Sequence, residues 1–281
     1  MDKRLTRAGR LLYGSSIVAI GVLQLCYPVF RPVILPAWSL PGEIIWVWLA
    51  GFLLIGAGIA IVTERQTRKV ALLLGGFFLA LFLFGHVPYE LFVDPYSKHL
   101  GVWTNALKEL ALSGGAFAVA GSIPPGSSMP FGPSMTHGKI PESSGMVKAL
   151  EKLIPLSRIF FSITMISFGI DHFLYPTGVS TLVPAWIPGG AHFWTYFAAV
   201  ALIGSGVCII LKIKLQLVAL LLGIMIGLWV IVLHIPRAVA DPFGMQSNEV
   251  ISVFEAVNFT GIAFLIAYGY YDFFALPRPT L

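Results

Sequence analysis

The sequence predicts an all-α integral membrane protein, with eight transmembrane helices arranged as two four-helix repeats of the same orientation. Three observations support this: an apolar composition, eight long apolar runs and an internal repeat. Of the 281 residues, 57% are hydrophobic and only 11% are charged, and the mean hydropathy is +0.85. Because soluble domains carry about 25% charged residues, the composition excludes a soluble domain and indicates a chain that lies in a lipid bilayer.

Each of the eight runs is long enough to cross a hydrocarbon core, which takes about 20 helical residues. The predicted helices are 10–27, 43–63, 69–87, 103–121, 157–175, 191–211, 213–235 and 250–271.

Basic residues predict the orientation of these helices. Of the 18 Lys and Arg residues, 14 fall in segments on the side of the two termini, whereas Arg31, Lys98 and Arg237 fall on the other side and Lys108 lies inside a predicted helix. Cytoplasmic loops carry the excess of Lys and Arg, so both termini are expected in the cytoplasm. The net charge of +5 is scattered over short loops and forms no basic face, which argues against a nucleic-acid partner.

A displacement of 148 residues superposes one half of the chain on the other. The matching motifs are Tyr27-Pro28 with Tyr175-Pro176, Pro36-Ala-Trp38 with Pro184-Ala-Trp186, Val70–Gly75 with Val218–Gly223, and His86-Val-Pro88 with His234-Ile-Pro236. Each repeat has an even number of helices, so we expect both repeats to have the same orientation and to be related by an axis along the membrane normal. The predicted domains are 1–121 and 151–281, joined by a Pro-, Gly- and Ser-rich flexible cytoplasmic linker at 122–150.

The order of motifs in the second half resembles the DoxX-like family of four-helix bacterial membrane proteins. The resemblance rests on Phe168–Phe173, Val183–Pro188, Gly204-Ser-Gly206, His234–Arg237 and Glu255 followed by Gly261. Both halves are covered, so the chain resembles a tandem of two such units. The resemblance implies a location in the bacterial cytoplasmic (inner) membrane and an association with membrane redox chemistry, with a redox partner subunit.

Ionisable residues recur at similar depths near the outer end of the helices. At 1.5 Å per residue, Glu255 lies about 9 Å below the outer surface, while His234 and His172 lie about 25 and 21 Å above the inner surface of a core about 30 Å thick. A charge at the centre of a span costs about 2.5–3.5 kcal/mol on insertion scales, so such groups normally face the bundle interior and pair. The first half offers a corresponding cluster of Gln24, His86, Lys108 and Glu109.

We therefore predict an outward-facing site in the second half, with Asp171, His172, His234 and Glu255 as its catalytic residues. The residues predicted to bind a cofactor are Arg237, Trp186, Asn258, His86 and Glu109. A structural role remains the alternative: Glu255 would then form an ion pair with Arg237 or His234, and each His-x-Pro would end a helix.

Two kinds of cofactor fit these residues. His172, His234 and Glu255 form a nitrogen and oxygen set that suits a transition metal, although no H-x-x-x-H or E-x-x-H pair occupies one helix. A quinone is the other candidate, bound behind interfacial tryptophans. Cys26 falls near the outer end of the first predicted helix and Cys208 near the inner end of the sixth, so the two cannot form a disulfide. Electrons would therefore have to pass through a quinone, a metal or a partner.

Two functions therefore remain open. The first is a redox-associated membrane subunit with a quinone or metal site. The second is a non-enzymatic carrier or accessory protein for a small apolar ligand or lipid, in which the same residues fix the helices and orient a headgroup. The sequence leaves open whether any reaction is catalysed.

Overall fold

The computed structural model describes residues 3–27, 29–38, 40–124 and 145–269, and these residues form helices joined by turns and loops, with no strand. Seven helical segments in this part of the chain are long and apolar enough to cross a membrane. They are Lys3–Leu25, Glu43–Val62, Thr67–Phe92, Gly145–Leu174, Ala191–Ile210, Leu215–Ala240 and Gly244–Tyr268. The chain is therefore an all-α protein with the character of a multi-pass membrane protein.

Twelve α-helices, two π-helical segments and two short 3-10 segments follow one another in the described residues. The helices are α1 (Lys3–Leu25), α2 (Glu43–Val62), α3 (Thr67–Leu81), α4 (Val87–Phe92), α5 (Thr104–Gly121), α6 (Gly145–Glu151), α7 (Ser157–Leu174), α8 (Pro176–Ser180), α9 (Ala191–Ile210), α10 (Leu215–Trp229), α11 (Ile235–Ala240) and α12 (Gly244–Tyr268). The π-helical segments are η1 (Phe82–His86) and η4 (Val230–His234). The 3-10 segments are η2 (Leu100–Trp103) and η3 (Ile154–Leu156).

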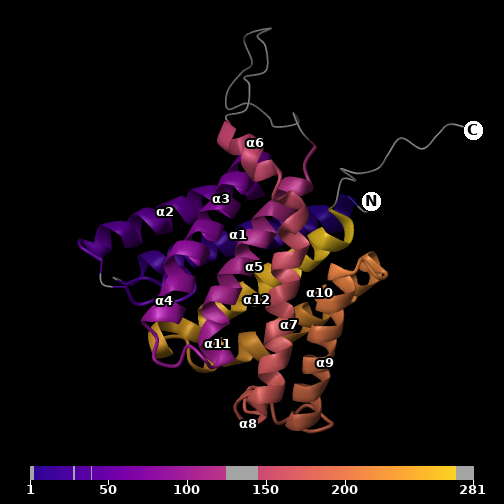
Figure 1. Cartoon of the computed structure of the whole chain (residues 1–281). Helices are drawn as coiled ribbons and strands as arrows, with labels where there is room; N and C mark the ends of the chain where they lie inside the picture. Colours follow the sequence, from indigo (N-terminus) through magenta and orange to yellow (C-terminus); the bar gives the residue numbers. More distant parts are fainter. Residues whose placement is uncertain (1–2, 28, 39, 125–144, 270–281) are drawn as a thin grey trace, which may run out of the picture.

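Helices from the two halves of the sequence interlock (Figure 1). α1 packs mainly on α2 and α12, and α7 packs mainly on α9 and α5. α3 lies against α5, and α10 lies against α12. α5 and α12 also contact each other, and every residue of α5 from Glu109 to Gly121 is buried. The two last helices of the halves therefore form the interior, and the other long helices surround them.

The helices that carry His86 and His234 continue past the following proline instead of ending there. α3 passes through η1 into α4, and α10 passes through η4 into α11. In each case the proline occupies the first turn of the short helix, where its fixed φ suits helical geometry. The expectation that these His-Pro motifs end the helices is therefore wrong. Each histidine is instead the last residue of a π-helical segment, a feature often found at functional sites.

Glycines let α1 approach α2 closely. A Cβ added to Gly58 would lie 2.6 Å from the carbonyl oxygen of Gly14, whereas one added to Gly56 would meet no atom within 4 Å. The same contrast recurs on α9, where a Cβ on Gly206 would lie 2.9 Å from the Ser162 oxygen and Gly204 faces open space. Gly58 and Gly206 thus set the helix spacing, because any side chain there would push the helices apart.

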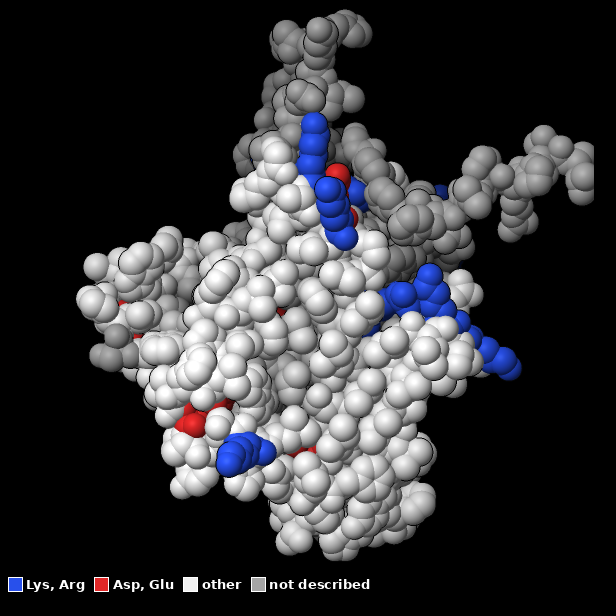
Figure 2. Space-filling model, in the orientation of Figure 1, with Lys and Arg blue, Asp and Glu red and all other residues white. Residues whose placement is uncertain are grey.

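The outer surface of the bundle is apolar over most of its area. Figure 2 shows few charged side chains, gathered in small groups near the ends of the helices. Large apolar residues on α2 and α9 are exposed, among them Trp48, Phe52, Phe197 and Val200. A soluble protein rarely exposes such a continuous apolar surface, and this arrangement fits helices that contact lipid.

The predicted linker is described only in part. Residues 125–144 lie outside the described residues, whereas 145–151 form α6. Arg68 on α3 binds α6 through Nε and Nη2, which lie 3.1 and 3.0 Å from Glu151 Oε1. Its Nη1 donates hydrogen bonds to the carbonyl oxygens of Ala120 and Ile123 at the end of α5. One buried arginine thus joins α3, α5 and α6.

Candidate functional site

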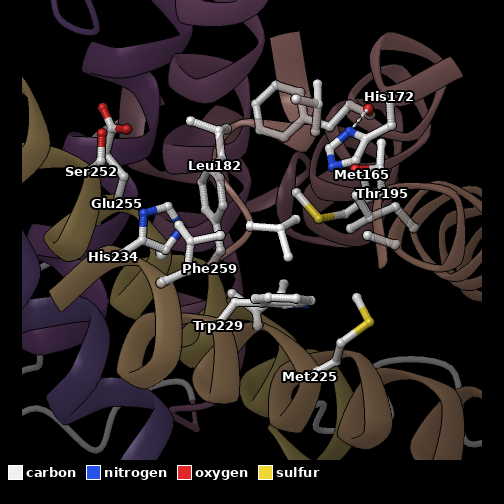
Figure 3. Close-up of a pocket in the computed structure, with 18 of the residues that line it drawn as sticks. Met165, His172, Leu182, Thr195, Met225, Trp229, His234, Ser252, Glu255 and Phe259 are labelled. Carbon is white, nitrogen blue, oxygen red and sulfur yellow. Dashed lines mark hydrogen bonds between the residues drawn. The ribbon is translucent and has the colours of Figure 1, made fainter. Parts of the chain in front are cut away.

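A cavity of about 240 Å³ lies among α7, α9, α10 and α12 (Figure 3). Its walls are mainly apolar and include four aromatic rings and two methionines: Phe168, Trp194, Trp229, Phe259, Met165 and Met225. An apolar cavity of about 150 Å³ is enough to hold benzene. The cavity here is therefore large enough for one substituted ring.

One end of the cavity carries an ion pair between the two halves of the chain. Lys108 Nζ, from α5, lies 2.7 Å from Glu255 Oε2, on α12. The side chains of Lys108 and Glu255 are 20% and 7% exposed. His234 and Ser252 line the same end, and Figure 3 shows both beside Glu255. A charged pair in this apolar setting gives the cavity one strongly polar end.

The opposite end carries His172 and Thr195, which lie together in Figure 3. The Nδ1 atom of His172 is 2.7 Å from the carbonyl oxygen of Phe168, one helical turn earlier. The Thr195 hydroxyl donates a hydrogen bond to the carbonyl oxygen of Ala191 at 3.0 Å. The helix backbone thus holds both side chains, and Trp229 lies along the cavity wall between the two ends (Figure 3).

Three of the four predicted catalytic residues line this cavity, namely His172, His234 and Glu255. Asp171 does not, so the prediction that all four converge is wrong. Neighbouring residues of a helix point about 100° apart, and His172 takes the direction of the cavity. The Asp171 Oδ1 atom is buried and has no hydrogen-bond partner in the described part of the chain.

The predicted cofactor-binding residues lie elsewhere. Arg237 forms a two-pronged pair with Glu249, with its Nε 2.9 Å from Oε2 and its Nη2 2.6 Å from Oε1. Trp186 is 68% exposed. Asn258 is buried and donates a hydrogen bond to the Tyr13 carbonyl oxygen at 3.5 Å. None of the three lines the cavity. The alternative pairing of Glu255 with Arg237 is also wrong, because each has a different partner.

His86 and Glu109 form a separate, sealed pair in the first half. His86 Nε2 lies 3.1 Å from Glu109 Oε2 without the geometry of a hydrogen bond, and both side chains are 0% exposed. The loop between α1 and α2 covers this region: Ile34 is buried, and Trp38 Nε1 donates a hydrogen bond to the Gly85 carbonyl oxygen at 3.0 Å. This pair therefore lies in a packed interior and not beside the cavity.

Gln24 and Lys108, the other members of the predicted first-half cluster, do not join His86. Gln24 accepts a hydrogen bond from the Arg31 backbone N–H and donates one to the Val29 carbonyl oxygen, at 2.9 and 3.0 Å. The buried Arg31 guanidinium lies 4.3 Å from the centre of the Tyr27 ring and donates a hydrogen bond to the Gln246 carbonyl oxygen. Burial lowers the pKa of Arg31 from its usual value. These residues therefore hold the α1–α2 loop against the start of α12.

A metal site does not form from the predicted ligands. In the described residues, no group of three or more His, Cys, Asp and Glu side chains could hold a metal ion. His172 lies at one end of the cavity, whereas His234 and Glu255 lie at the other (Figure 3). The three side chains thus share a cavity without sharing one coordination centre.

Several residues that line the cavity carry no distinguishing signal in the sequence. Thr195, Ser252 and Trp229 resemble ordinary residues of apolar helices, because aromatic and small polar side chains face lipid or protein with the same sequence pattern. Lys108 stood out as a charge within a helix, but sequence could not show that it faces the other half.

No protein-family model, curated protein or solved structure matches the chain.

Proposed function

We propose that this protein binds a quinone-type ligand in the cavity among α7, α9, α10 and α12. A quinone or quinol has a flat apolar ring with oxygen atoms at two opposite ends. The observation that carries the proposal is the matching arrangement of the cavity, in which aromatic and methionine side chains separate two polar ends (Figure 3). Binding cavities typically combine apolar walls with a few polar groups that orient the ligand.

The two ends would form different interactions with the two ring oxygens. Lys108 can donate hydrogen bonds from its ammonium group, while Glu255 and His234 can accept or exchange protons. His172 and Thr195 would contact the oxygen at the far end. The ring would lie among Trp194, Trp229 and Phe259 and gain contact with their faces and edges.

A role in membrane redox chemistry follows from this ligand class. Quinones carry electrons and protons together, and proton-exchanging groups stand at both ends of the cavity. We propose that the protein is a redox-associated subunit that works with a partner, as the resemblance to DoxX-like proteins implies. The partner would supply or remove the electrons, because Cys26 and Cys208 are both free cysteines and offer no dithiol.

The finer topology is part of the same proposal. We propose that α5 is an eighth span, that the halves are repeats of one orientation, and that both termini lie on the cytoplasmic side of the bacterial inner membrane. The burial of α5 among the seven apolar helical segments supports an eighth span. Local features at a spacing of 148 residues support the repeats: positive φ angles at Glu64 and Gln66 recur at Lys212 and Lys214, and η1 recurs as η4.

A non-enzymatic carrier for a small apolar ligand or lipid is the second candidate. It is favoured by the Lys108–Glu255 pair, because two charges that neutralise each other need no charged ligand. A carrier would bind apolar molecules of suitable size, whether or not they carry two oxygens.

Analysis of co-purified molecules separates the two candidates. Protein purified in mild detergent would be extracted with organic solvent, and the extract analysed by mass spectrometry for quinones and lipids, with metal content and the absorption spectrum measured in parallel. We expect quinone in near-stoichiometric amount, and its loss in a Trp229→Ala variant. A variant at an exposed aromatic residue of α2, Phe52→Ala, serves as the control. Lipid without quinone in the wild-type extract would favour the carrier.

A further inference from the structure

The atoms that His172, Thr195 and Ser252 present to the cavity are hydrogen-bond acceptors. Eight side chains with polar atoms line it: Lys108, His172, Trp194, Thr195, Trp229, His234, Ser252 and Glu255. The indole N–H of Trp194 is donated to the Pro188 carbonyl oxygen at 2.7 Å, so of the two indoles Trp229 keeps its N–H for a ligand. For His172, Thr195 and Ser252, a hydrogen bond to the backbone fixes where the hydrogen lies. The donor and acceptor roles left for a ligand can therefore be worked out residue by residue.

His172 presents an acceptor. A carbonyl oxygen can only accept a hydrogen bond, so the contact at 2.7 Å between His172 Nδ1 and the Phe168 oxygen places the ring hydrogen on Nδ1. In an uncharged imidazole the other nitrogen, Nε2, then carries no hydrogen and acts as an acceptor. The backbone of α7 thus sets the tautomer of His172.

Thr195 and Ser252 also present acceptors. A hydroxyl group has one hydrogen, and in each of these residues it is donated to the carbonyl oxygen one turn earlier. The Thr195 hydroxyl binds the Ala191 oxygen at 3.0 Å, and the Ser252 hydroxyl binds the Asn248 oxygen at 2.9 Å. Only the lone pairs of both oxygens remain for a ligand.

The two ends of the cavity therefore differ in the ligand group with which they can form hydrogen bonds. At the charged end, Lys108 retains two ammonium hydrogens beyond the one directed at Glu255, and Glu255 retains its second oxygen, so this end can bind a carbonyl or a hydroxyl group. At the end formed by His172 and Thr195, both side chains only accept. A ligand carbonyl oxygen there would face these two acceptors, whereas a hydroxyl group would donate to one of them.

We infer that the cavity binds the reduced, hydroxyl-bearing form of its ligand more tightly than the oxidised form, through a hydroxyl group that donates a hydrogen bond to Nε2 of His172. The inference rests on the proposed function, because it assumes a quinone-type ligand. It goes further by naming the redox state that is bound and the atom that distinguishes the two states.

Titration of the purified protein with a matched ligand series tests the inference. The series comprises a short-chain alkyl hydroquinone, the corresponding quinone, and the dimethyl ether of the hydroquinone, which keeps the ring and both oxygens but has no donor. Binding would be followed anaerobically by the fluorescence of the cavity tryptophans. We expect the hydroquinone to bind about tenfold more tightly than the quinone or the ether, because one lost hydrogen bond at a buried acceptor is worth about that factor.

Two variants locate the effect. In His172→Gln the amide can turn to donate or accept, so the preference for the hydroquinone should fall to about twofold or less. His192→Gln alters an exposed histidine at the start of α9 that does not line the cavity, and it should keep the full preference. If all three compounds bind wild-type protein equally, or the quinone binds best, the inference is overturned and the proposed site stands. If none of them binds, the proposed function itself fails.

Discussion

Replacing Lys108 by Met should destabilise the protein by about 3 kcal/mol. The substitution removes one partner of an ion pair with a separation of 2.7 Å and leaves Glu255, whose side chain is 7% exposed, without its counter-charge. Breaking a buried pair by removing one partner costs about 3–5 kcal/mol. We take the lower end because the Lys108 side chain is 20% exposed and keeps part of its hydration.

A double-mutant cycle isolates the contribution of the pair. Lys108→Met, Glu255→Gln and the double variant would be unfolded in detergent and compared with wild type. The double variant should recover most of the loss, because neither charge remains, and the coupling energy should be about 2 kcal/mol or more. The more exposed Arg237–Glu249 pair, with side chains 35% and 19% exposed, serves as the control and should couple by about 1 kcal/mol or less. A stable Lys108→Met variant, or strictly additive losses, would refute the reasoning.

Three further outcomes are expected. Gly58→Ala should cost about 1–3 kcal/mol of unfolding free energy, because its Cβ would lie 2.6 Å from a backbone carbonyl oxygen of α1, whereas Gly56→Ala on the same helix should be neutral; equal effects of the two would contradict the close packing. Glu109→Gln should lower the unfolding temperature while leaving the affinity for the alkyl hydroquinone unchanged, and a loss of affinity would place the sealed pair in the site. In a cysteine-free background, an impermeant thiol reagent applied to intact cells should label Lys98→Cys but not Met146→Cys, and the reverse pattern would invert the proposed topology.

The sequence was most informative about helices and depth. Apolar runs of about 20 residues are set by the thickness of the bilayer, so they can be read without any knowledge of tertiary contacts. The depths of His172, His234 and Glu255 follow from the rise per residue. Those three residues do line one cavity.

Rotation about each helix axis could not be predicted. Asp171 and His172 are neighbours, and so are Lys108 and Glu109, yet only one of each pair faces the cavity. In a soluble helix, the polar face shows which side is buried. A helix surrounded by lipid and apolar protein has no such contrast, so the face that binds a ligand carries no distinct pattern.

The packing of helices from one half against helices from the other could not be predicted from the sequence either. Treating each half as its own bundle assigned Lys108 to a cluster with Glu109, whereas α5 lies between the halves and Lys108 pairs with Glu255. The π-helical segments were likewise missed. A His-x-Pro motif predicts a helix end. Only the structure shows that the helix continues past the proline through a wider, π-helical turn.

Photo-crosslinking with an azido-substituted quinone tests the central claim most directly. The purified protein would be irradiated with the probe, in the presence and absence of excess unlabelled hydroquinone, and the modified peptides identified by mass spectrometry. A ligand bound in the cavity should label Met225 and Trp229 on α10 and Met165 on α7, and the competitor should suppress this labelling. Labelling confined to the exposed faces of α2 and α9, or labelling of α10 that the competitor leaves unchanged, would contradict a quinone-type site in the cavity.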